Sequence, residues 1–234
     1  MTGIKGKKIS IRTVEKELID IYDLLLSAYG PRFWWPAETT LEMVFGAILV
    51  QNVTWKSIAE VINKMNTSGL LDSLAILKTE NEYLYEIIRA SRYYRNKAKS
   101  LKEFSKHLQE KYDGNIERLL DQRVETLRKE LLDIYGIGYE TADSIILYGS
   151  GQPVFVVDAY TRRIFNRLGF FERKITYKSM QEYFSDALYP DVEMYKEYHA
   201  LLVYHGSRVC LAKKPQCFKC VLKPMCEYYK TSMK

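Results

Sequence analysis

The four cysteines of the 234-residue chain constrain its fold more than any other feature, because all of them fall between residues 210 and 226. Their spacing is C-x6-C-x2-C-x5-C, at Cys210, Cys217, Cys220 and Cys226. Disulfides are not expected, since nothing near the N-terminus resembles a signal peptide, and closely spaced thiolates are typical metal ligands. The donor set suits zinc or an iron–sulfur cluster equally. The pattern therefore predicts a C-terminal loop pinned by a metal centre.

Composition and charge limit the class of protein. Hydrophobic residues make up 47% and charged residues 27%, which is typical of globular proteins and excludes disordered and fibrous classes. The longest apolar run, Met43–Val50, is too short to span a bilayer, so we expect a cytoplasmic protein with no membrane partner. Lysine and arginine total 35 against 29 acidic residues, a net charge of +6 that suits a polyanionic partner.

Hydrophobic residues recur mainly with the helical period, and alternation typical of strands is nearly absent. The sequence therefore predicts an all-α fold. Two helix starts carry a capping pair, Thr39 with Glu42 and Thr79 with Glu82. A short step at 153–157 is expected to be extended. The predicted helices cover residues 12–29, 40–50, 55–66, 80–91, 96–112, 124–134, 139–149, 158–168, 177–187 and 191–206.

A Gly-x-Gly turn separates two of these helices, at Gly136-Ile137-Gly138. Glycine permits left-handed backbone angles, so the chain can turn tightly and direct amide groups at the start of the next helix. Such amides, together with the helix dipole, can bind a phosphate. A plain helix end followed by a turn explains the same residues, and the turn alone does not decide between the two interpretations.

The run LLDIYGIGYETADSIILYGSGQPVFVVDAYTRRIFNRL, residues 131–168, resembles the helix-hairpin-helix DNA glycosylases of the endonuclease III family. That family carries an L-P-G-V-G-x-x-T-A hairpin, an extended V-D step and a catalytic aspartate, which corresponds to Asp158 here. The cysteine spacing matches the family's cluster loop. The segment Gly46–Asn52 resembles its first barrel helix, which ends in a glutamine that inserts into DNA; the glutamine is Gln51 here.

This resemblance implies a two-domain helix-hairpin-helix glycosylase fold. A six-helix barrel domain would span residues 38–147, and residues 1–37 with 148–234 would form the second domain. The resemblance also implies a 4Fe-4S cluster in the loop 210–226, held by the four cysteines. A monomer that acts on double-stranded DNA in the cytoplasm, associated with the nucleoid, is the expected setting.

Two departures from the family pattern indicate the substrate. Bifunctional members use a hairpin lysine as nucleophile, and Glu140 occupies that position, so no Schiff base can form and the enzyme is expected to be monofunctional. An acidic residue there, a Trp-Trp-Pro segment and an aromatic after the glutamine resemble the 3-methyladenine DNA glycosylase branch. A cationic methylated purine would stack on indole rings and be favoured by a nearby carboxylate. The implied base pocket consists of Trp34, Trp35, Pro36 and Trp55.

The resemblance also implies roles for individual polar residues. Asp158 would stabilise the oxocarbenium-like sugar or activate water, and Glu140, the second expected catalytic residue, would lie near the base pocket. The alternative for Asp158 is a helix N-cap, and both roles can coexist. Arg92, Tyr93 and neighbouring cations form a basic segment with interleaved aromatics. The residues expected to contact DNA are Gln51, Asn52, Gly136, Ile137, Gly138, Tyr139, Thr141, Tyr94 and Lys97.

The leading hypothesis is a base-excision-repair glycosylase that flips out an alkylated purine such as 3-methyladenine and hydrolyses its N-glycosidic bond. Removal of uracil, mismatched thymine or oxidised bases by the same fold is an alternative. A non-catalytic DNA-binding module and a zinc-bound scaffold without a DNA role are alternatives of other classes.

Overall fold

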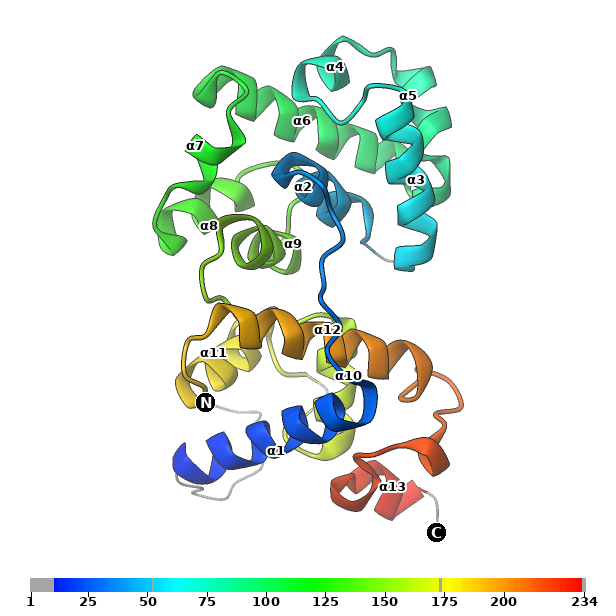
Figure 1. Cartoon of the computed structure of the whole chain (residues 1–234), viewed down its shortest axis with the longest axis vertical. Coiled ribbons are helices and arrows are strands. Elements are labelled where there is room, and N and C mark those ends of the chain that lie inside the picture. The colour runs from blue at the N-terminus through cyan, green and yellow to red at the C-terminus, as the bar shows by residue number, and fades with distance from the viewer. Residues whose placement is uncertain (1–10, 52, 173, 233–234) are drawn as a thin grey trace. The chain divides into compact units, whose positions relative to one another are not determined.

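The computed structural model describes residues 11–51, 53–172 and 174–232. Helices are the regular elements of these residues, and no strand occurs among them. The chain divides into two compact units, one formed by Trp35–Gln152 (unit 2) and one by the residues up to Trp34 and from Pro153 onward (unit 1) (Figure 1). The predicted division into domains at residues 38 and 147 stays a prediction. No helix within the described ranges is long and apolar enough to cross a membrane.

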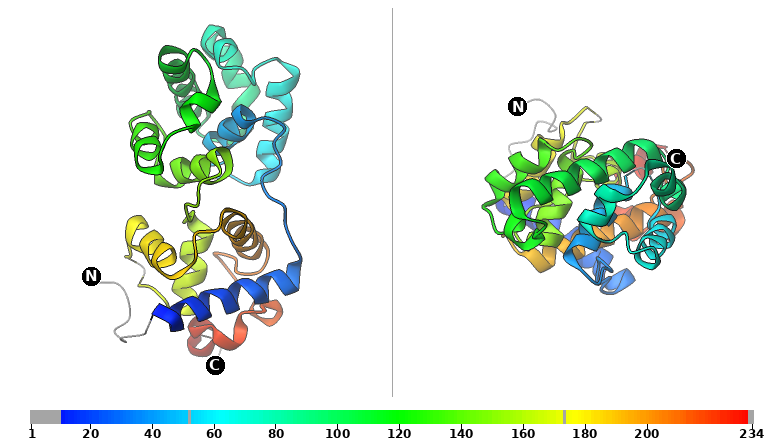
Figure 2. Two further views of the ribbon diagram at one scale, coloured as in Figure 1. Left: turned by 60° about the vertical axis from the view of Figure 1, so that its left-hand side comes forward. Right: turned by 90° about the horizontal axis from the view of Figure 1, so that it is seen from above.

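Unit 2 is built around α2 (Thr40–Leu49), whose residues Met43–Leu49 are all buried. A helix buried on every side must be apolar all round, which explains the long apolar run in the sequence. The helix packs against α3, α6, α7, α9 and η2, and its blue ribbon lies among the cyan and green helices of unit 2 in Figures 1 and 2. The other elements are α3 (Trp55–Thr67), α4 (Ser73–Lys78), α5 (Asn81–Ile88), η1 (Arg89–Ser91), α6 (Tyr94–Tyr112), α7 (Ile116–Leu120), α8 (Val124–Leu132), α9 (Tyr139–Ser144) and the π-helical turn η2 (Ile145–Ser150).

The two predicted capping pairs have different outcomes. The Thr39 hydroxyl accepts a hydrogen bond from the backbone N–H of Glu42 at 3.1 Å, so the predicted start of α2 is confirmed. The prediction for Thr79 is wrong: its hydroxyl donates to the carbonyl of Ala75 at 2.7 Å, and it caps the end of α4. Sequence periodicity missed α4 because a six-residue helix is too short to show a repeat.

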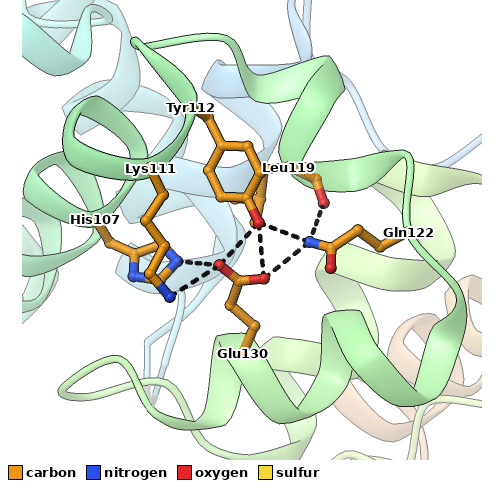
Figure 3. A network of polar contacts seen from close by, with 6 residues as sticks. All are labelled: His107, Lys111, Tyr112, Leu119, Gln122 and Glu130. Atoms are coloured by element: carbon orange, nitrogen blue, oxygen red, sulfur yellow. Dashed lines mark hydrogen bonds and ion pairs between the residues drawn. The ribbon is translucent and has the colours of Figure 1, made fainter.

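A partly buried carboxylate joins α6, α8 and the turn before α8 (Figure 3). Glu130 accepts hydrogen bonds from Tyr112 at 2.8 and 2.9 Å and from Gln122 at 2.8 Å, and it lies 2.6 Å from the ring nitrogen of His107. Lys111 contacts it more loosely, at 3.5 Å. Burial would raise the pKa of Glu130, but the bonds from Gln122, Tyr112 and His107 outweigh it and the pKa is lowered. The carboxylate therefore stays ionised and ties the helices together.

Unit 1 is centred on α12 (Val192–Arg208), which packs against α1 (Ile11–Tyr29) and α10 (Ala159–Leu168). Its core is aromatic: the rings of Phe155 and Phe184 stack with centroids 4.1 Å apart. Phe155 belongs to the segment 153–157, which forms no strand and whose residues 154–157 are buried. The remaining elements are α11 (Tyr177–Ala187), η3 (Cys217–Lys219), η4 (Lys223–Met225) and α13 (Glu227–Ser232).

Candidate functional site

The turn between α8 and α9 uses its two glycines differently. Gly136 has φ 82°, and a Cβ there would lie 1.9 Å from the Ser100 hydroxyl, so this position needs glycine for conformation and for space. Gly138 has φ −97° and is the N-cap of α9, with open space where a Cβ would project. Ile137 is buried between them and anchors the turn. Gly138 and Tyr139 are exposed at the start of α9.

A buried ion pair fixes the two helices of this hairpin. The guanidinium of Arg128 on α8 donates to the carboxylate of Asp143 on α9 at 2.6 Å. Asp143 is fully buried, so loss of the arginine would leave a charge in the interior. Sequence reasoning missed this pair, because a charged residue within a helix gives no sign that it faces inward.

Gln51 contacts the hairpin directly. Its side-chain amide donates to the carbonyl of Gly136 at 3.1 Å and to the hydroxyl of Thr141 at 2.9 Å. The structure thus brings together three of the residues expected to bind DNA, from segments 85 and 90 residues apart. Insertion of Gln51 into DNA stays a prediction. Asn52 lies outside the described residues.

The expectation that Lys97 binds DNA phosphate is wrong. Its side chain is buried, and the ammonium donates to the carbonyls of Leu49 and Gln51 at 2.7 Å each and to that of Ser91. These three acceptors match the three N–H donors of a lysine. Burial, with a smaller effect of Arg92, lowers the pKa of Lys97 to about 8. Lys97 therefore links two parts of the chain, the segment that contains Gln51 and the turn before α6.

That turn has an unusual backbone. Arg92 (φ 53°, ψ 155°) and Tyr93 (φ 45°, ψ 32°) both take positive φ angles, which cost free energy in residues other than glycine. The Tyr93 ring is 63% exposed. The ring of Tyr94, the residue expected to contact DNA, is half-buried and packs against Tyr85 with centroids 5.6 Å apart. Stacking of Tyr94 on a base stays a prediction.

An aromatic cluster surrounds Trp35 in unit 2. The ring centroid of Trp35 lies 5.0 Å from that of Trp55 and 5.4 Å from that of Tyr148, with edge-to-face geometry in both pairs. Gly46 on α2 faces this ring, and a Cβ there would meet it at 3.4 Å, in van der Waals contact. Sequence analysis named the two tryptophans but not Tyr148. Trp34 is half-buried at the end of its segment of unit 1, and Pro36 is exposed.

The two expected catalytic carboxylates have contrasting environments. Glu140 is exposed in the first turn of α9. Asp158 is buried and is the N-cap of α10, since its Oδ1 accepts from the backbone N–H of Thr161 at 2.6 Å. Its Oδ2 lies 3.7 Å from Nε2 of His199 on α12. The N-cap role is confirmed, while the catalytic roles of both residues stay predictions.

The four cysteines are free thiols in unit 1. Burial, with smaller contributions from the other three cysteines, raises the pKa of Cys220 to about 11. Arg167 donates to the sulfur of Cys210 at 3.2 Å and to the carbonyl of Leu211 at 2.7 Å, which orders the start of the loop. Within the described residues, however, no three histidine, cysteine, aspartate or glutamate side chains are arranged as a metal site. Four thiols near one another have the right chemistry for a thiolate-bound centre, because a metal would offset the cost of buried thiolates.

Comparison with known proteins identifies the family. A model of the HhH-GPD superfamily of base excision DNA repair proteins matches residues 45–190. The chain belongs to this superfamily. It is 46% identical to a protein of Methanocaldococcus jannaschii provisionally named a DNA repair glycosylase, over 88% of this chain and 94% of that protein. Endonuclease III of Sulfolobus acidocaldarius is 33% identical, over 82% of this chain and 83% of that protein.

Solved structures establish the fold. Endonuclease III trapped as a covalent intermediate with DNA has a TM-score of 0.81 at 22% identity, over 94% of this chain and 99% of that one. A 3-methyladenine DNA glycosylase of H. pylori, bound to 1,N6-ethenoadenine, has a TM-score of 0.69 at 25% identity, over 86% and 98%. The all-helical endonuclease III-like fold expected from the sequence is therefore confirmed.

Proposed function

We propose that this protein is a monofunctional DNA glycosylase that releases an alkylated, cationic purine such as 3-methyladenine from double-stranded DNA. The aromatic cluster of Trp35, Trp55 and Tyr148 carries the proposal. Indole and phenol rings attract a cationic base by about 0.5–2 kcal/mol each. The likeness to a 3-methyladenine DNA glycosylase structure supports the same substrate class.

Individual residues have separate roles in the proposed reaction. Glu140, in the position of the family's lysine nucleophile, adds negative charge that favours a cationic base and cannot form a Schiff base. Asp158 stabilises the positive charge that develops on the sugar as the glycosidic bond breaks. Gln51 and the hairpin residues Gly136–Tyr139 hold the DNA. The protein acts as a monomer, in the cytoplasm.

Cys210, Cys217, Cys220 and Cys226 are proposed to hold a 4Fe-4S cluster. Support comes from their spacing in the sequence and from the chemistry of four thiols in one loop, which suits a thiolate-bound cluster. Such a centre orders a loop that buries little apolar surface and takes no part in bond breakage here.

Mass spectrometry of free bases released from DNA that contains methylated, deaminated and oxidised lesions tests the proposal. We expect 3-methyladenine in the supernatant and an intact backbone on a denaturing gel. Trp55→Ala should abolish release while Trp55→Phe retains part of it, because a smaller aromatic ring still stacks. Release of uracil, thymine or an oxidised base instead would refute the alkylated-purine assignment.

Asp158→Asn separates the two roles of that residue. Asparagine caps helices as well as aspartate, so stability should change by less than about 1 kcal/mol. Release should nevertheless fall by several orders of magnitude, because the charge is gone. If Asp158→Asn releases the base as fast as the wild type, capping α10 is the only role of Asp158.

A further inference from the structure

The carboxylate of Asp158 has one oxygen held by its own helix and one directed at another helix. Oδ1 accepts from the backbone of Thr161, which is the N-cap bond of α10. Oδ2 faces Nε2 of His199, on α12, at 3.7 Å. Both side chains are buried, and α10 packs against α12, so the contact is fixed by the core of unit 1. The N-cap bond alone does not require a histidine at this place.

The charge state of Asp158 depends on this contact. Burial disfavours the carboxylate, but the interaction with His199, followed by those with Thr161, outweighs burial and the pKa of Asp158 is lowered. Asp158 is therefore a buried group that is kept ionised. A carboxylate without charge could not stabilise a developing oxocarbenium ion.

Other ionisable groups on α10, α11 and α12 form hydrogen bonds with the backbone. On α10, Arg162 donates to the carbonyl of Ile175 and Arg163 to those of Gly206 and Cys210. On α12, the hydroxyls of Tyr195 and Tyr198 donate to the carbonyls of Leu188 and Leu18. From α11, the Tyr177 hydroxyl accepts from the backbone of Val157 at 3.4 Å.

We propose that His199 is a positioning residue for base release, which orients the free oxygen of Asp158 and maintains the carboxylate in its charged form. This inference rests on the proposed catalytic role of Asp158 and adds a second residue, from a different helix, to the same step. His199 itself touches no substrate. Its effect on catalysis is exerted through Asp158.

The rate of base release in single turnover, measured against pH for the wild type and His199→Gln, tests the proposal. Removing the histidine should move the acid limb of the profile to higher pH by about one unit, because the buried carboxylate loses the partner that favours its charged form. At neutral pH the rate should fall about tenfold, equivalent to about 1.4 kcal/mol. A merely structural histidine would lower the rate equally at every pH, and an acid limb that does not move would overturn the inference.

A second measurement does not depend on the folding of His199→Gln. The chain has three histidines, so their ring proton signals can be resolved and assigned by NMR. In Asp158→Asn, which keeps the N-cap, the ring proton signals of His199 should change position relative to the wild type, because the neighbouring carboxylate has lost its charge, while those of His107 in unit 2 should not. Unchanged His199 signals would show that the two groups do not interact.

The outcomes distinguish this inference from the function on which it rests. If the wild type releases no base, or Asp158→Asn remains active, the proposed function of Asp158 fails. If the wild type is active, Asp158→Asn is inactive and His199→Gln has the wild-type pH profile, the proposed function stands and the role of His199 is refuted.

Discussion

The two hairpin glycines should respond differently to the same substitution, with a large loss of stability at Gly136 and little change at Gly138. Gly136→Ala places a Cβ where the Ser100 hydroxyl now lies, at 1.9 Å, in a residue with φ 82°. A left-handed backbone costs a residue with a Cβ about 1–2 kcal/mol. Overpacking adds about 1–3 kcal/mol, since Ser100 must rotate away and give up its bond to the carbonyl of Asn96. We expect Gly136→Ala to lower the free energy of unfolding by about 3 kcal/mol.

Gly138→Ala is the matched control. Its φ of −97° suits any residue, and a Cβ would meet no atom within 4 Å. Stability should stay within about 1 kcal/mol of the wild type, because the weaker N-cap is offset by a less flexible unfolded chain. The open space in front of Gly138 is where a phosphate would approach the backbone, so DNA affinity should fall about tenfold, or about 1.4 kcal/mol.

Urea unfolding followed by circular dichroism gives the stabilities, and fluorescence anisotropy of a labelled duplex gives the affinities. The reasoning is refuted if Gly136→Ala is as stable as the wild type, since the Ser100 contact would then be easily relieved. It is equally refuted if Gly138→Ala binds DNA with wild-type affinity, because the hairpin would then not meet the backbone at that residue.

Three further predictions concern other parts of the chain. Glu130→Ala should destabilise the protein by about 3 kcal/mol, whereas Lys111→Ala, at the exposed edge of the same network, should cost under about 0.5 kcal/mol; urea unfolding measures both. Because the pKa of Glu130 is lowered in the folded state, its charge stabilises the protein at pH values above 4.5, the ordinary pKa of the group. The difference in stability between the wild type and Glu130→Ala should shrink as the pH falls through the lowered pKa. Lys97→Met should lower stability by about 2 kcal/mol and slow base release from duplex DNA more than from single strands, since three carbonyls lose their donor; equal slowing on both substrates would contradict a role in opening the duplex. Cys226→Ser should remove visible absorbance and lower the thermal midpoint of unit 1, and a colourless wild-type protein would exclude the iron–sulfur cluster.

Local features of the sequence determined the helices and their ends. The apolar run of α2 and the cap at Thr39 were predicted correctly, since both depend on residues within one or two turns of each other. The N-cap role of Asp158 is a local property of the same kind. The short helices α4 and α7 were missed, because five or six residues are too few for a period to show.

Only the tertiary structure decided which polar side chains face inward. Lys97 stands among exposed cations in the sequence, yet its ammonium is bound by the nearby Ser91 carbonyl and by the carbonyls of Leu49 and Gln51, which lie 48 and 46 residues away. Gln51 and the hairpin meet across 85 residues, and His199 meets Asp158 through the packing of α12 on α10. Such contacts depend on which helix faces pack together, and the hydrophobic period of one helix does not specify the polar partner on another.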